Sequence, residues 1–265
     1  MTISPSSTAG SRPLASSPIS HRFTASDGVE LLWHELGEGR PVVLLHGLFS
    51  NAETNWLKFG HAAEIASRGF RLIMPDLRGH GASGAPHDPG HYPPDILARD
   101  GFELLAHLGL EHYDLGGYSL GGRTAARMAI LGARPRRLVV SGMGLPGMLD
   151  TGRREAHFRK IIQGMGTHVR GSPEWMAEMF LKTTGADPRA MLPLLGSFVD
   201  STEGELRSIA VPTLVVSGAE DDDNGSAQAL ADLLLDGRFT QIPGNHMSAV
   251  TKPELGRAIA DFLAA

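Results

Sequence analysis

The chain contains no cysteine among its 265 residues, and only 6% of them are aromatic. Without cysteine, disulfide bonds, thiolate metal sites and a cysteine nucleophile are excluded. No apolar run approaches the roughly 18 residues that a bilayer-spanning helix needs, so we expect no membrane partner and, by default, a cytoplasmic location. The formal net charge of -5 gives no basic excess of the kind that binds nucleic acid. A small, neutral molecule is the expected partner, and the oligomeric state stays open.

The length of the chain suits one α/β domain that carries an insertion. Residues 1–20 hold seven serines and three prolines without apolar periodicity. They also lack the charged segment and the apolar run of a secretory signal, so we expect a flexible tail there. We expect residues 21–145 and 208–265 to form the core of the domain, and residues 146–207 to form a helical cap.

The order of strand and helix patterns predicts a mostly parallel central sheet flanked by helices. A hairpin of two half-buried strands is expected at 21–26 and 29–36, joined by Asp27 and Gly28. Short apolar runs then alternate with helical patterns, which is typical of parallel strands buried on both faces. The runs lie at 41–45, 70–74, 138–140 and 212–216, and the helical patterns lie at 55–68, 95–108 and 120–131. The expected fold class is therefore α/β.

No strand pattern is present between residues 146 and 207, where helical stretches are broken by glycine and proline. Six of the ten methionines fall between Met143 and Met191. Methionine fills irregular gaps in cores and also lines adaptable binding surfaces. The cap methionines can therefore pack the cap onto the core, line a pocket, or do both.

The pentapeptide GYSLG at 117–121 indicates a nucleophilic serine. A G-x-S-x-G sequence between a strand and a helix places its serine on a sharp turn, and the flanking glycines avoid the Cβ atoms that would not fit there. Here a short apolar strand precedes the pentapeptide and a small-residue helix follows it. Ser119 is therefore the expected nucleophile, and it needs a base and an orienting carboxylate.

Candidates for the base and the acid follow later in the chain. Asp221 lies in the loop that leaves the strand at 212–216, at the sheet edge where open α/β sheets bind ligands. His246 lies in a loop that follows the apolar run around Phe239. A shift of one residue would exchange Asp221 for one of its acidic neighbours. These neighbours are Glu220, Asp222 and Asp223.

Five stretches in this order resemble the α/β-hydrolase family over about residues 28–265. They are LLHGLF (44–49), PDLRGHGAS (75–83), GYSLG (117–121), VPTL with GAED (211–214 and 218–221), and IPGNH (242–246). The resemblance implies Ser119 as the nucleophile, His246 as the base and Asp221 as the acid. It implies no metal or other cofactor.

The resemblance also assigns two backbone groups and two histidines. Acyl transfer needs preorganised N–H groups for the oxyanion, and in this family the places are filled by Leu120 and Leu48, with Phe49 as the alternative to Leu48. His46 and His80 belong to structural turns of the family, and we expect no direct chemistry from them.

These residues predict a carboxylic-ester hydrolase that cleaves small, largely apolar esters or lactones through an acyl intermediate on Ser119. We expect the methionine-rich cap to set specificity, because thioether side chains repack readily. The residues expected to bind substrate are Phe49, Tyr118, Met143, Trp175, Met176 and Met247.

Other reactions that this scaffold serves stay open. Dehalogenases and epoxide hydrolases resemble the chain but carry aspartate in place of Ser119, and carbon–carbon bond hydrolases typically carry tryptophan where Met247 stands. The heptapeptide GYSLGGR also resembles the elbow of a menaquinone-pathway lyase, in which the arginine, here Arg123, helps to hold a polyanionic substrate. A non-catalytic receptor for a small ligand is the alternative outside the enzymes.

The basic residues near the expected site have a simpler interpretation. Arg123 can be a surface residue that flanks its helix. Several basic residues of the cap are expected on a solvated helix face. These are Arg153, Arg154, Arg159 and Lys160.

Overall fold

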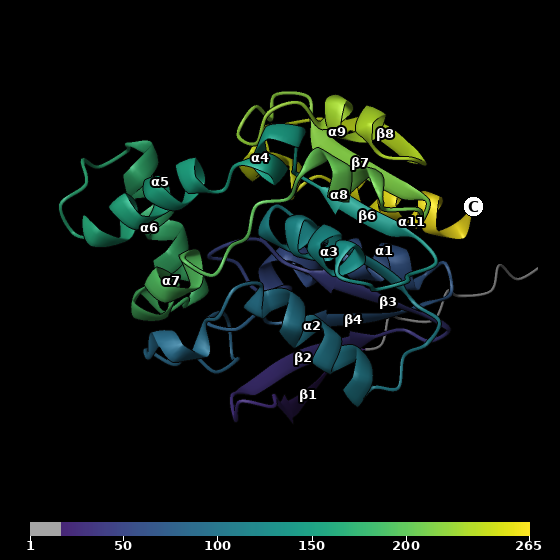
Figure 1. Ribbon diagram of the computed structural model, residues 1–265, viewed down its shortest axis with the longest axis horizontal. Helices are drawn as coiled ribbons and strands as arrows, with labels where there is room; N and C mark the ends of the chain where they lie inside the picture. Colours follow the sequence, from purple (N-terminus) through teal and green to yellow (C-terminus); the bar gives the residue numbers. More distant parts are fainter. Residues whose placement is uncertain (1–16) are drawn as a thin grey trace, which may run out of the picture.

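The computed structural model describes residues 17–265, and an eight-stranded sheet lies at its centre (Figure 1). The strands are β1 (Ile19–Thr24), β2 (Glu30–Leu36), β3 (Arg40–Leu45), β4 (Phe70–Pro75), β5 (Asp114–Tyr118), β6 (Leu138–Ser141), β7 (Thr213–Gly218) and β8 (Gly237–Ile242). Their order across the sheet is β1-β2-β4-β3-β5-β6-β7-β8. β2 pairs antiparallel with β1 and β4, and all other neighbours pair parallel. The prediction of a mostly parallel sheet is confirmed.

Strand β3 is the point at which the chain reverses its direction across the sheet. The chain passes from β3 to β4 on one side, and then returns to β5 on the other side of β3. In open α/β sheets, ligands bind beyond the carboxyl ends of the strands at such a switch point. The register pairs Leu45 at the end of β3 with Gly117 of β5. The loops that follow these two strands therefore begin side by side.

Helices cover both faces of the sheet. The core helices are α1 (His61–Ala66), α2 (Ile96–His107), α3 (Leu120–Ile130), α9 (Ala227–Leu233), α10 (His246–Ala249) and α11 (Pro253–Ala264). α1 and α11 pack on the face that carries Val42 and Leu44, while α2, α3 and α9 pack on the face that carries Val43 and Leu45. Alternate residues of β3 thus enter two separate cores, which is why its sequence is apolar throughout.

Two predicted boundaries differ from the structure. Residues 1–16 of the expected tail lie outside the described residues, and Ile19, also assigned to the tail, begins β1 and pairs with Glu35. The helix expected at 55–68 is divided into a π-helix, η1 (Glu53–Leu57), and α1. Gly60 separates them with a φ of 79°, a left-handed conformation that glycine adopts without a steric penalty.

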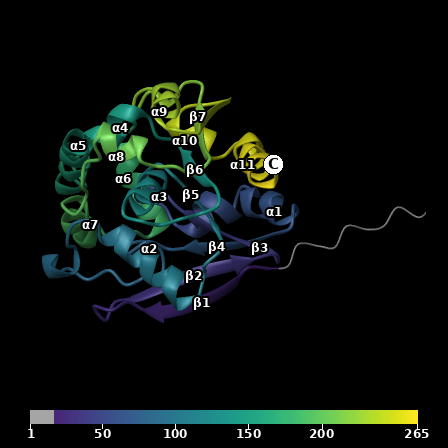
Figure 2. The same ribbon diagram turned by 45° about the vertical axis from the view of Figure 1, so that its right-hand side comes forward.

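Five helices connect β6 to β7. They are α4 (Leu145–Leu149), α5 (Gly152–Gln163), α6 (Pro173–Thr184), α7 (Pro188–Leu195) and α8 (Glu203–Arg207). Figures 1 and 2 both show α5, α6 and α7 grouped at one side of the molecule, outside the layers around the sheet. The predicted breaks coincide with helix ends, since Ser172 caps α6 and Gly185 ends it with a φ of 73°. Among residues 17–265, no helix has the length and apolar character required to cross a membrane.

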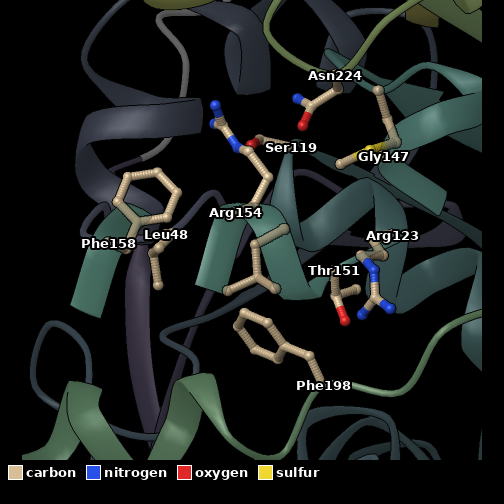
Figure 3. Close-up of a pocket in the computed structure, with 11 residues that line it drawn as sticks. Leu48, Ser119, Arg123, Gly147, Thr151, Arg154, Phe158, Phe198 and Asn224 are labelled. Atoms are coloured by element: carbon tan, nitrogen blue, oxygen red, sulfur yellow. The ribbon is translucent and has the colours of Figure 1, made fainter. Parts of the chain in front are cut away.

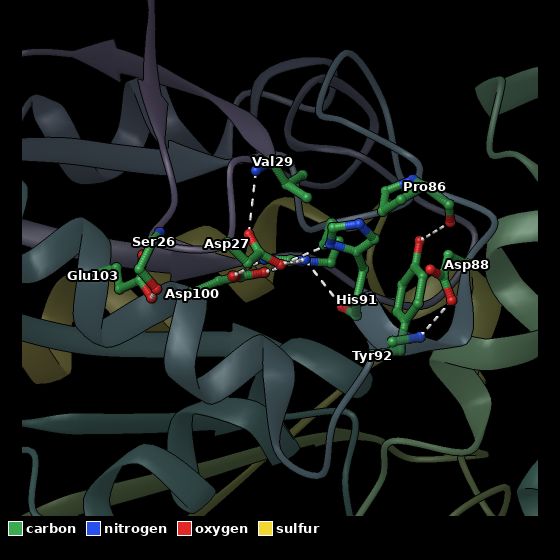
Figure 4. A network of polar contacts seen from close by, with 11 residues as sticks. Ser26, Asp27, Val29, Pro86, Asp88, His91, Tyr92, Asp100 and Glu103 are labelled. Atoms are coloured by element: carbon green, nitrogen blue, oxygen red, sulfur yellow. Dashed lines mark hydrogen bonds and ion pairs between the residues drawn. The ribbon is translucent and has the colours of Figure 1, made fainter.

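A buried ion network joins the β1–β2 turn to the core (Figure 4). Arg78, in the loop after β4, donates two hydrogen bonds to Asp100 of α2, at 2.7 and 2.9 Å. It also donates to Asp27 in the hairpin turn, and its guanidinium holds the pKa of the Asp27 carboxyl well below its usual range. The network anchors the start of the loop whose later residues support the candidate site.

Candidate active site

The turn that carries Ser119 is built from glycines. Ser119 follows β5 directly and precedes α3, with a φ of 54° and a ψ of -116°. A Cβ on Gly121 would overlap the carbonyl oxygen of Leu45, and one on Gly117 would overlap the backbone of Gly121. The neighbouring strand also helps to hold this strained conformation, because the Ser119 N–H donates to the carbonyl of Ser141 at 2.7 Å.

Ser119, His246 and Asp221 form a continuous line of hydrogen bonds. The Ser119 Oγ lies 3.0 Å from His246 Nε2, and His246 Nδ1 lies 3.0 and 3.2 Å from the two carboxylate oxygens of Asp221. An ionised carboxylate can only accept, so it favours the tautomer with the proton on Nδ1. Nε2 is then free to accept the proton of the serine hydroxyl. The structure brings together the three residues that the sequence singled out.

The register at the acidic loop favours Asp221 over its neighbours. The loop turns directly after β7, where the Asp221 N–H donates to the carbonyl of Gly218 at 3.1 Å. The Asp221 side chain is buried against the imidazole, whereas Glu220, Asp222 and Asp223 are exposed. The carboxylate three positions after Gly218 is therefore the one that faces His246.

His246 is the first residue of α10, and this end of the helix is held by β5, the strand that precedes the nucleophile. The buried Tyr118 hydroxyl donates to the backbone carbonyl of His246 at 2.6 Å, and burial raises the pKa of Tyr118 well above its usual range. The hydroxyl therefore stays protonated as a donor. Tyr118 therefore links the end of β5 to the start of α10 and helps to set the distance between Ser119 and His246.

Two backbone N–H groups are placed for a developing oxyanion. Leu120 is the first residue of α3, so its N–H has no partner within the helix. In the loop after β3, the Phe49 N–H already donates to His80 Nε2 at 3.1 Å. Within residues 17–265, the Leu48 N–H has no such acceptor. The geometry therefore favours Leu48 over Phe49 as the second donor.

Two side chains, Asn55 and Asp76, hold this donor loop in place. Asn55 of the π-helix accepts the Gly47 N–H at 3.0 Å, and Asp76 accepts the N–H groups of Ala52 and Ala82, both at 2.9 Å. Burial alone would raise the pKa of Asp76, but the facing His34 and these N–H groups lower it to about 2. The sequence interpretation gave no role to Asn55 or Asp76. For Asp76, the only signal in the sequence was its place in the stretch 75–83, which resembles the family.

His46 and His80 support the same loop, as the resemblance implied. His46 Nε2 accepts the Leu77 N–H at 2.9 Å, and its Nδ1 donates to the carbonyl of Gly47 at 2.8 Å. Burial lowers the pKa of both histidines, that of His80 to about 3. Both imidazoles are therefore neutral and fully engaged.

Among residues 17–265, two cavities adjoin Ser119. The smaller, of about 40 Å³, lies between the turn that carries Ser119 and helices α4 and α5. It is lined by residues that include Leu120, Arg123, Arg154, Phe158 and Phe198 (Figure 3). The larger, of about 310 Å³, is lined by residues that include Asn55, Phe180, His246 and Val250. Ser119 and Leu48 border both cavities. A substrate bonded to Ser119 can therefore extend to either side.

The residues predicted to bind substrate divide into two groups. Met143 lines the smaller cavity, and Tyr118 and Met247 line the larger one. Three others line neither cavity, which corrects their assignment. These are Phe49, Trp175 and Met176.

The corrections have physical reasons. Phe49 is only 2% exposed, because its ring points into the core and packs edge-on against Phe158 at 5.3 Å. Met176 lies on the outer face of α6 and is 58% exposed. The structure places Phe180, one turn further along α6, at the larger cavity instead. Helical spacing identified the helix correctly, but it could not identify the face that turns inward.

Arg123 and Arg154 also depart from the expectation of a solvated surface. Arg123 is 5% exposed and lines the smaller cavity. Arg154 reaches the same cavity from α5 (Figure 3). No group of three or more histidine, aspartate or glutamate side chains within residues 17–265 is arranged to hold a metal ion.

A family model described as the alpha/beta hydrolase family matches residues 42–255. The chain belongs to this family. A non-heme haloperoxidase from Rhodococcus erythropolis is 30% identical over 262 residues, covering 83% of this chain and 90% of that protein. The alpha/beta-hydrolase fold and a general hydrolase activity follow from this membership.

Solved structures agree with the family assignment. An esterase from Thermogutta terrifontis superimposes with a TM-score of 0.73 and 25% identity, covering 94% of this chain and 98% of that one. The enol-lactonase from Burkholderia xenovorans LB400 superimposes with a TM-score of 0.77 at 21% identity, covering 92% of this chain and all of that one. The second likeness shows that the alpha/beta-hydrolase fold is shared.

Proposed function

We propose that this alpha/beta hydrolase is a serine esterase that cleaves small carboxylic esters or lactones through an acyl intermediate on Ser119. The observation that carries the proposal is the unbroken line from Ser119 Oγ through the His246 imidazole to the Asp221 carboxylate. A serine hydroxyl is a weak nucleophile by itself, and this arrangement supplies both the base and the group that orients it.

The reaction follows from the positions of these atoms. Ser119 Oγ attacks the ester carbonyl carbon while His246 Nε2 takes its proton, and the N–H groups of Leu48 and Leu120 stabilise the oxyanion. When the tetrahedral intermediate collapses, the bond to the leaving oxygen breaks and His246 returns the proton to that oxygen. Water then attacks the acyl group by the same route, with His246 as base, and releases the acid and free Ser119.

The wall of the larger cavity and one structural neighbour support an ester as the substrate. The larger cavity has a mostly apolar wall that includes Phe180, Met247 and Val250, which suits an uncharged leaving group. Epoxide hydrolases, which resemble this chain, carry an aspartate at the position of Ser119, so the serine argues against epoxide opening. The esterase from Thermogutta terrifontis, a structural neighbour, is named for ester cleavage.

The test is turnover of a panel of p-nitrophenyl esters and simple lactones by the wild type and by Ser119→Ala. We expect the substitution to lower kcat/KM by about 10³ to 10⁶ without unfolding the protein. Ser67→Ala is the matched control, because Ser67 is exposed at the end of α1 and far along the chain from the elbow. Ester turnover by Ser119→Ala within tenfold of wild type would refute the proposal. A rise in Tm with ligands but no turnover would support the receptor alternative instead.

A further inference from the structure

Arg123 is a buried cation that forms no ion pair with a carboxylate among residues 17–265. Three arginines of residues 17–265 are buried, namely Arg78, Arg123 and Arg127. Arg78 pairs with two carboxylates, and Arg127 pairs with Asp95 at 2.5 Å. Within the described part of the chain, no carboxylate oxygen lies within 4 Å of Arg123. A buried charge is costly unless an opposite charge compensates it.

The local contacts of Arg123 satisfy its guanidinium only in part. One Nη donates to the backbone carbonyl of Val199, and the Phe198 ring centroid lies 5.6 Å from the guanidinium carbon. No group of residues 17–265 accepts a hydrogen bond from its Nε. The Asp200 carboxylate instead accepts from the N–H and hydroxyl of Thr151, at 2.8 and 2.6 Å. Burial lowers the pKa of Arg123 to about 10, so the group remains charged at neutral pH.

A second guanidinium faces the same cavity. Arg154 projects from α5 toward the smaller cavity, and Figure 3 shows it on the side of Asn224, opposite Arg123. Its carboxylate partner is Asp223, whose oxygen is 3.6 Å away and which is about half exposed. The wall of the cavity beside Ser119 therefore carries two positive charges. Two carboxylates lie near them, Asp223 beside Arg154 and Asp200, engaged by Thr151, near Arg123.

The positions of His246 and Leu120 indicate which half of an ester enters each cavity. His246 must return its proton to the leaving oxygen, and it lines the larger cavity but not the smaller one. Of the two residues that contribute an oxyanion N–H, Leu120 lines the smaller cavity and Leu48 borders both. The leaving alcohol therefore extends into the larger cavity, and the acyl half extends toward Arg123 and Arg154.

Resting on the proposed ester hydrolysis, we propose that the smaller cavity is an acyl subsite for a short chain that ends in a carboxylate. The preferred substrates are then monoesters of short dicarboxylic acids. The carboxylate supplies the negative charge that Arg123 lacks, and the volume of about 40 Å³ restricts the acyl chain to a few carbons. The larger cavity, of about 310 Å³, accepts a bulkier and uncharged alcohol half.

The first test compares two esters of the same alcohol, monobenzyl succinate and benzyl butyrate, which both have four-carbon acyl groups. Arg123→Met removes the charge and keeps most of the side-chain length. We expect it to lower the ratio of kcat/KM for the succinate ester to that for the butyrate ester by about tenfold or more. Arg153→Met is the matched control, since Arg153 is exposed on the same cap helix as Arg154, and it should change the ratio less than twofold. An unchanged ratio in Arg123→Met would overturn the proposal and leave the esterase function standing.

The second test measures binding without catalysis. In the Ser119→Ala background, succinate should raise the Tm, butyrate should raise it less, and adding Arg123→Met should remove the difference. The Tm without ligand also reports folding of Arg123→Met, which should equal or exceed that of its parent because an unpaired buried charge is lost. Equal Tm shifts by succinate with and without Arg123 would overturn the proposal. Shifts that depend on Arg123, in a protein without ester turnover, would support the subsite and refute the proposed reaction.

Discussion

Asp221→Asn is the substitution that tests the candidate triad most directly. The change keeps the size of the side chain and removes its charge and half of its capacity to accept hydrogen bonds. Both carboxylate oxygens of Asp221 lie within 3.2 Å of His246 Nδ1. An amide nitrogen placed there would donate to Nδ1 and move the ring proton to Nε2. Nε2 would then point a proton at Ser119 Oγ, and it could no longer act as a base.

The magnitude follows from the loss of this tautomer and of the charge that stabilises the imidazolium. In serine hydrolases with the same arrangement, an Asp-to-Asn change at this position lowers kcat by about 10⁴, which corresponds to about 5.5 kcal/mol at 1.36 kcal/mol per factor of ten. Stability should change far less, because the substituted side chain has the same shape and remains buried. We expect a nearly inactive protein with a Tm close to that of the wild type.

The assay is the steady-state hydrolysis of p-nitrophenyl acetate by four matched variants. Glu220→Gln, Asp222→Asn and Asp223→Asn make the same chemical change at exposed neighbours of Asp221, and each should retain kcat within about tenfold of wild type. Asp223→Asn also weakens the contact with Arg154, so a small effect on KM is expected there. If one of the three controls is the severe variant, or if Asp221→Asn is mild, the register at this loop is wrong.

Three further predictions concern stability, specificity and pH. Arg78→Met leaves two carboxylates without their partner and should lower the free energy of unfolding by about 3 to 5 kcal/mol in urea titrations. Arg68→Met, at an exposed ion pair, should lower it by at most about 1 kcal/mol, and equal effects of the two variants would contradict the role given to burial. Phe198→Ala enlarges the smaller cavity and should shift the relative kcat/KM toward longer acyl chains by about 1 to 3 kcal/mol, while Met176→Ala, outside both cavities, should leave the ranking unchanged. Because the pKa of Asp76 is lowered from 3.8 to about 2, its stabilising contribution of about 2 kcal/mol is present above pH 4 and lost as the pH falls toward 2. The Asp76→Asn variant should therefore lose stability less steeply than the wild type over that interval, and the same dependence of stability on pH in both proteins would contradict this.

Much of the fold and the line of three side chains could be predicted because their signals are local. The elbow depends on glycines next to Ser119 and on the strand and helix that flank it, all within about a dozen residues. Asp221 and His246 follow apolar strands at short distances, and parallel strands bring their carboxyl ends to one edge of the sheet. Each signal needs only the chain nearby and the general rule for parallel sheets.

The cavity walls could not be predicted in the same way, because they depend on how helices α5 and α6 are rotated against the rest of the molecule. Met176 and Phe180 lie one turn apart on α6, yet only Phe180 reaches a cavity. The inward position of Arg154 likewise depends on the docking of α5. Charge and helical periodicity favoured an exposed position for it, and no residue near it in the sequence indicates otherwise.

The hydrogen bond between Tyr118 of β5 and His246 of α10 has a consequence for the way the protein folds. Ser119 and His246 are separated by 127 positions in the chain, and the Tyr118 hydroxyl bond that sets their distance spans 128. Contacts between such remote residues form late, because closing a long loop costs entropy before the contact can compensate for it. In refolding experiments, helical circular dichroism should therefore recover before catalytic turnover. The rate at which activity returns would then measure how fast β8 and α10, which carries His246, dock onto the sheet. It would not measure the collapse of the core.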